Sequence, residues 1–195
     1  MFFSILLLAH IQAAVIPIIL GIKSINKFTQ INKSKIIPFG FISLGLASIC
    51  EMIDHTQTSW VYVDHSSLFN WLFYSFLSLG LTFLSISVIK NKFFLITNIC
   101  ISFCSIISYF LFDKQIALFF QVIISIFLII NWQRTFKDWL LILYPIFGIF
   151  FTTFFGTNLS TSGDQFWHIL IGPSGTISVL SFYLVLKRSK KKYLR

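Results

Sequence analysis

Long apolar runs follow one another along the chain, separated by short polar segments. The run "QIALFFQVIISIFLIINW", residues 115–132, has no charged residue and ends on a tryptophan that we interpret as interfacial. A helix that crosses a bilayer needs about 20 mostly apolar residues. The pattern therefore predicts an all-α integral membrane bundle of seven transmembrane helices. The expected spans are residues 2–22, 36–54, 67–89, 93–112, 115–132, 139–156 and 165–186.

The links between these spans are short, so we expect one transmembrane domain over residues 1–186, followed by a basic tail over residues 187–195. No Lys or Arg precedes the first run, which continues to Gly21 and so favours a retained helix over a cleaved signal peptide. Composition agrees with a membrane protein, because 56% of the residues are hydrophobic and 11% are charged. Soluble domains have about 25% charged residues.

The basic residues predict the orientation of the bundle. They lie in the links after the first, third and fifth spans and in the tail, and only Lys114 lies on the other side. Since Lys and Arg accumulate on the cytoplasmic side, we expect the N-terminus outside and the C-terminus in the cytoplasm. We expect the tail to lie against anionic membrane lipids, and the net charge of +9 then needs no nucleic-acid partner. A bacterial inner membrane and an internal eukaryotic membrane both fit, and the oligomeric state is left open.

Acids and imidazoles gather on the side opposite the basic residues. Glu51 and His55 are four residues apart at the end of the second span, so they share a helix face. Asp164 and His168 repeat that spacing at the start of the last span. Carboxylates and imidazoles are zinc ligands, and ionisable groups within membrane spans need partners. We therefore expect a metal site, with zinc as the suspected cofactor, formed by Glu51, His55, Asp164 and His168.

The remaining polar residues have simpler interpretations. We expect His10 to bond within the bundle, to Gln12 or to a backbone carbonyl, and His65 to lie on a loop surface. The cysteines are odd in number, predict no disulfide framework and are expected to be small buried hydrophobic residues. They are Cys50, Cys100 and Cys104.

The last span contains two further signals. Ser162 and Gln165 form a capping box, which predicts that the helix starts there. Pro173 removes a backbone hydrogen bond further along. The proline either kinks the helix below His168 or, with Gly172, belongs to a segment where helices pack closely.

The arrangement of these residues resembles the CREST superfamily, which includes alkaline ceramidases, adiponectin receptors and haemolysin III-like proteins. The resemblance rests on seven spans, on His55 at the end of the second span and Asp64 at the start of the third, and on the "FWHIL" segment around His168. Two positions depart from the family pattern. Asp164 stands where the family has a zinc-binding His, and Glu51 stands where it has a Ser.

The resemblance implies a zinc-dependent hydrolase of a lipid amide or ester, in which zinc activates a water and Asp64 is the catalytic base. Two other classes stay open. The first is a non-catalytic multi-pass protein, such as a sensor, a ligand-binding protein or an assembly factor. The second is a small cation or proton transporter that uses Glu51 and His55. The lack of internal repeats in the sequence counts against transport.

Overall fold

The computed structural model describes residues 2–29, 31, 33–58, 67–112, 114–163 and 165–193. Within these residues, seven helical segments are long and apolar enough to cross a membrane, and no strand is found. The predicted seven-helix bundle is therefore confirmed. Its helices are α1 (Phe2–Ser24), α2 (Ile37–Thr58), α3 (Leu68–Ile86), α4 (Lys92–Leu111), α5 (Lys114–Phe136), α6 (Thr152–Ser162) and α7 (Gln165–Tyr193).

The sixth span is a composite of three helix types. It begins with a 3₁₀ turn, η2 (Trp139–Ile142), continues as a π-helix, η3 (Tyr144–Phe151), and ends as α6. Pro145, at the start of the π-helix, has no N–H to donate to the preceding turn. A short 3₁₀ turn, η1 (Ser34–Ile36), likewise precedes α2.

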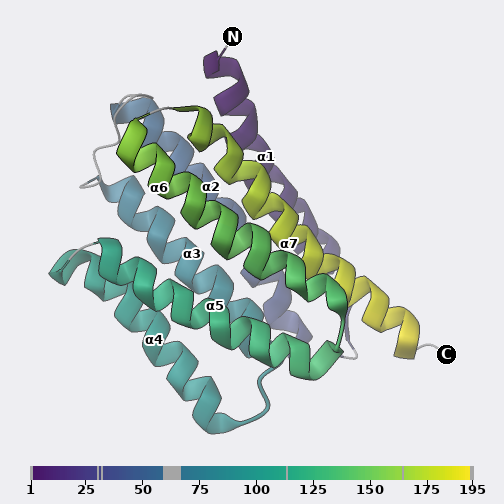
Figure 1. Ribbon diagram of the computed structural model, residues 1–195. Helices are drawn as coiled ribbons and strands as arrows, with labels where there is room; N and C mark the ends of the chain where they lie inside the picture. The colour runs from purple at the N-terminus through teal and green to yellow at the C-terminus, as the bar shows by residue number, and fades with distance from the viewer. Residues whose placement is uncertain are drawn as a thin grey trace.

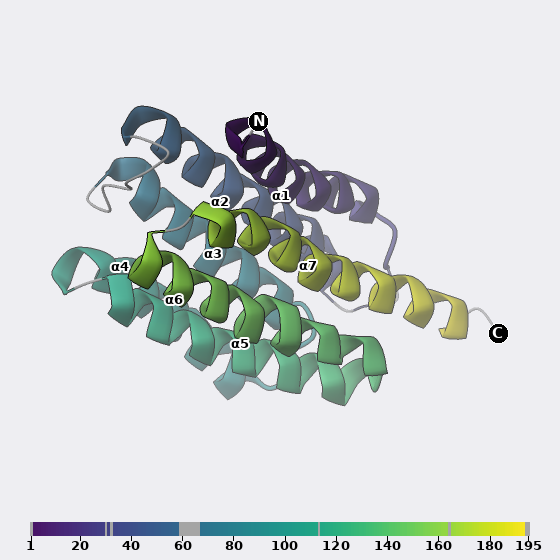
Figure 2. The ribbon, with the colours of Figure 1, turned by 45° about the horizontal axis from the view of Figure 1, so that its top comes forward.

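The helices divide into two groups that share α3 as a neighbour. Figures 1 and 2 show α1 beside α2 and α7, and α4 beside α5 on the far side of the bundle. Helix α3 packs against α2, α4 and α5, while η3 and α6 cover α7. The two chain ends lie at opposite ends of the bundle, as an odd number of spans requires (Figure 1).

A short connection joins α6 to α7. Ser162 is the last residue of α6, and its Oγ donates a hydrogen bond to the Asn158 carbonyl at 2.6 Å. Gly163, at φ 68°, ends α6 in the left-handed conformation that glycine adopts without strain. Helix α7 begins at Gln165, as predicted. The helix then continues to Tyr193, so much of the predicted basic tail is helical.

The sequence had indicated that Trp132 lies at the membrane interface, because it ends an apolar run. The structure instead places it inside the bundle. It is fully buried, and its Nε1–H donates to the Leu84 carbonyl at 2.8 Å. Its ring packs 4.7 Å from that of Phe182, centroid to centroid. The prediction failed because α5 continues to Phe136, which places Trp132 inside the bundle and not at its edge.

Helix α4 turns its polar side inward and its apolar side outward. Among its described residues, those that are buried are all polar. They are Asn98, Ser102, Ser105 and Ser108. Ser105 is hydrogen-bonded to Ser78 of α3 at 2.8 Å, and Gln121 of α5 donates to the same Ser78 at 3.0 Å. Such bonds hold helices together where the surrounding lipid is as apolar as the side chains.

The cysteines follow this arrangement. Cys100 and Cys104 are both exposed on α4, so the prediction that they are buried is wrong for this pair. Cys50 is buried, as expected. The small polar residues of α4 form its buried face, so Cys100 and Cys104 on the other face lie on the outside of the bundle.

Candidate metal centre

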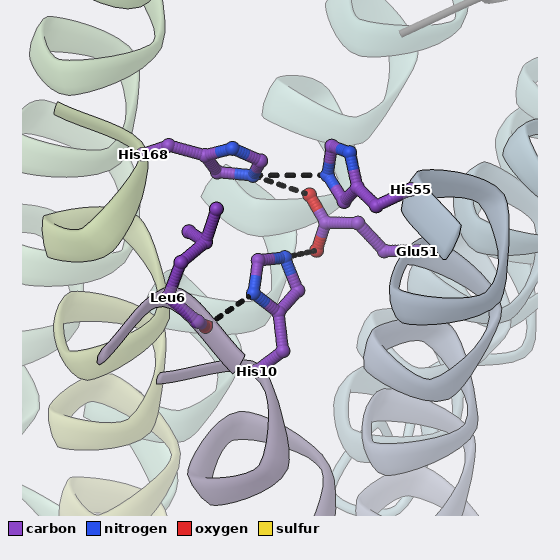
Figure 3. Close-up of polar contacts among 5 residues, drawn as sticks. All are labelled: Leu6, His10, Glu51, His55 and His168. Atoms are coloured by element: carbon purple, nitrogen blue, oxygen red, sulfur yellow. Dashed lines mark hydrogen bonds and ion pairs between the residues drawn. The ribbon is translucent and has the colours of Figure 1, made fainter. Parts of the chain in front are cut away.

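Three helices bring four potential metal ligands together near the N-terminal end of the bundle. His10 comes from α1, Glu51 and His55 come from α2, and His168 comes from α7. One ligand atom from each residue lies within 4.8 Å of those from the other three. Figure 3 shows the three imidazole rings and the carboxylate facing one another across the gap between the helices.

The closest pair is formed by two imidazoles. His55 Nε2 and His168 Nε2 are 3.1 Å apart, although the residues are far apart in the sequence. The Glu51 carboxylate lies beside both of the other helices, with Oε1 3.8 Å from His168 Nε2 and Oε2 4.0 Å from His10 Nε2. This carboxylate thus connects α2 to α1 and to α7.

The cluster is largely shielded from solvent. His10, His55 and His168 are each about 5% exposed or less, and Glu51 is 25% exposed. Charged groups in membrane spans are costly and usually face a partner, a cavity or an ion path. Here the acid faces two imidazoles, so its surroundings are polar on the inner side of the helix.

A backbone carbonyl sets the protonation of His10. Its Nδ1 is 2.9 Å from the Leu6 carbonyl oxygen (Figure 3). A carbonyl only accepts hydrogen bonds, so Nδ1 carries the proton. In the neutral ring Nε2 is then the unprotonated nitrogen, and it is the one that faces Glu51. The predicted bond to a backbone carbonyl is confirmed, but His10 also belongs to the cluster, which the sequence analysis missed.

Close helix packing places His10 between its partners. A Cβ on Gly172 of α7 would lie 2.8 Å from the Ala9 carbonyl oxygen of α1. A Cβ on Gly45 of α2 would lie 2.7 Å from the Ala14 carbonyl oxygen, also in α1. Both distances are too short for a real side chain, so α1 approaches each neighbour where only glycine fits. At Gly172 the close-packing interpretation of the sequence is therefore confirmed.

Comparison with known protein families agrees with this seven-span architecture. A family model described as "seven transmembrane receptor" matches residues 2–192. The chain belongs to this family. No curated protein and no solved structure matches it. The match identifies a seven-span integral membrane protein, whereas the narrower assignment to the CREST superfamily stays a prediction.

In this seven-span membrane protein, the predicted site residues divide into two sets. Glu51, His55 and His168 meet, as the sequence predicted, and together with His10 they could hold a metal ion. Asp64 and Asp164 lie outside the described residues, as does His65. A signal for His10 was present in the sequence, because it is an ionisable residue in the half of the first span that the predicted topology places level with Glu51.

Asp54, next to the cluster in the sequence, has a different role. It is 1% exposed and accepts a hydrogen bond from Ser67 Oγ. Ser67 is the N-cap of α3, where its Oγ also accepts from the Asn70 backbone N–H at 3.0 Å. The acid therefore ties the end of α2 to the start of α3.

Proposed function

We propose that this protein is a non-catalytic seven-transmembrane receptor that binds a zinc ion through His10, Glu51, His55 and His168. The observation that carries the proposal is the convergence of these four ligands from α1, α2 and α7 within 4.8 Å. The order of the helices in space, with α1 packed against both α2 and α7, makes the ion a link among all three.

The donor set suits zinc. Imidazole nitrogen and carboxylate oxygen are both common zinc ligands. Zinc–nitrogen bonds of about 2.0–2.1 Å in tetrahedral geometry place two ligand nitrogens about 3.3 Å apart. The 3.1 Å between His55 Nε2 and His168 Nε2 is close to that value. A divalent cation would also offset the charge of Glu51 inside the bundle.

The number of ligands favours binding over hydrolysis. Structural zinc sites usually have four protein ligands, whereas catalytic sites have three and keep a position for water. Three imidazoles and one carboxylate complete a tetrahedral set. Zinc bound by all four ligands would favour the arrangement in which α1 is packed against α2 and α7. A ligand shifts a conformational equilibrium toward the state that it binds more tightly.

The metal content of the purified protein tests this proposal. Wild type in detergent should contain about one zinc per chain by elemental mass spectrometry, as one four-ligand site requires. His55→Ala/His168→Ala should contain none, while His65→Ala, the control for removal of an imidazole, should keep the metal. A folded wild type that stays metal-free after zinc is added would disprove the proposal.

A lipid hydrolase is the second candidate. It is favoured by the contact between His55 and His168, the two histidines that the CREST resemblance assigns to zinc. In that case Asp64→Ala should retain zinc and lose hydrolysis of lipid amides or esters. If wild type binds zinc and hydrolyses neither class of lipid, the receptor proposal is favoured.

A further inference from the structure

A second polar site lies at the other end of the bundle, beyond the metal centre. A cavity of about 350 Å³ is located where α5 ends and α7 passes beside it. Lys137, Asp138 and Arg188 provide its charged groups, and Phe136 and Val185 provide apolar surface. We propose that this cavity binds the phosphate group of an anionic lipid head group.

The charges of the cavity favour an anion. Lys137 has φ 48°, so the chain turns sharply there and places this residue between α5 and η2. Asp138 accepts a hydrogen bond from the Leu140 backbone N–H at 3.0 Å and lies 3.3 Å from Arg188 Nη1. The cavity is therefore lined by two cations and one acid, and the acid holds the guanidinium in place. A guanidinium has five N–H donors, so several stay available for phosphate oxygens.

The position of the cavity favours a lipid over a soluble phosphate. The fifth span ends at Phe136, the sixth begins at Trp139 and the seventh ends at Ser189. All three boundaries meet at the cavity, which therefore lies at the depth of lipid head groups. Trp139 is 66% exposed and its ring lies 5.4 Å from the Arg188 guanidinium carbon. Exposed Trp beside Arg is typical of the membrane interface.

The apolar part of the cavity supports the same choice. Phe136 and Val185 line the cavity together with the charged groups. A free phosphate has no apolar part that could contact these two side chains. A lipid places its glycerol and the first methylenes of its chains directly below the phosphate. Basic pockets between transmembrane helices are known to bind anionic head groups.

Native mass spectrometry of the detergent-purified protein tests the proposal. Wild type should retain phosphatidylglycerol in preference to phosphatidylcholine. Lys137→Gln/Arg188→Gln should bind phosphatidylglycerol roughly 25-fold more weakly, since each basic residue near the lipid changes affinity roughly fivefold. Lys23→Gln/Lys27→Gln, which removes the same charge from another link, should bind like wild type.

Three outcomes would overturn the proposal. The first is equal weakening in both double variants, which would indicate attraction by net charge alone. The second is no preference for phosphatidylglycerol in wild type. The third is displacement of the lipid by inorganic phosphate at equal concentration, which would identify a soluble phosphate as the ligand. An unchanged melting temperature of the pocket variant checks that it is folded.

Discussion

The Leu6 carbonyl determines which ring nitrogen of His10 carries the proton and which one faces the other ligands. By accepting from Nδ1, it leaves Nε2 toward Glu51, 4.0 Å away. The proton position of a metal-binding imidazole is commonly set in this way by an acceptor on its other nitrogen. Among the described residues, the centre thus consists of three imidazoles and one carboxylate.

The contribution of the Glu51 charge to zinc binding can be tested without changing the size of the side chain. Glu51→Gln should lower zinc affinity by more than about tenfold, because loss of even an outer hydrogen-bond partner of a metal ligand costs 10–100-fold. A competition titration against a zinc chelator measures the change. Asp54→Asn, which alters another buried acid of α2, should bind zinc like wild type. Equal losses in the two variants would show that Glu51 acts through helix stability and not as a ligand.

At the scale of the elements, α1 determines whether the centre is complete. It contributes one ligand, and its position depends on the close approaches at Gly45 and Gly172. Helix α7 contributes His168 one turn before Gly172. The same contact between α1 and α7 that packs the bundle therefore also sets the distance between His10 and His168.

Gly172→Ala tests this coupling between packing and binding. The new Cβ would lie 2.8 Å from the Ala9 carbonyl, so α1 must shift. Overpacking of this kind costs about 1–3 kcal/mol. We expect a lower melting temperature together with weaker zinc binding. Gly175→Ala is the matched control, because a Cβ there meets nothing within 4 Å. Wild-type zinc affinity in Gly172→Ala would contradict the role of α1.

At the scale of the whole molecule, the two proposed sites lie at opposite ends of one helix. His168 is near the start of α7 and Arg188 is near its end. The metal centre joins α7 to α1 and α2, whereas the lipid cavity joins it to the turn after α5. The proposed metal site and the proposed lipid site are thus at opposite ends of the bundle.

The orientation of the bundle is a prediction at this scale. Basic residues on one face should place the C-terminus, and with it the lipid cavity, in the cytoplasm. A reporter that is active only in the cytoplasm should therefore work when fused after Arg195 and fail when fused before Met1. The reverse pattern would place the metal centre in the cytoplasm, and the prediction from charge would be wrong.

The number and order of the spans could be predicted from the sequence alone, because hydropathy is a local property of about 20 residues. The pairing of Glu51 with His55 was predictable for a similar reason, since helix geometry places residues four apart on one face. These predictions depend on no contact with another helix. The family match over residues 2–192 agrees with them at the level of the seven-span architecture.

Only the tertiary structure decided which faces of the helices meet. His10 joins the centre because α1 packs between α2 and α7, and nothing within the first span specifies those neighbours. Trp132 is buried and Cys100 is exposed for the same reason, since each depends on which side of its helix turns inward. In a membrane, apolar residues satisfy both the lipid and the interior, so hydropathy finds the spans but does not tell which side faces in.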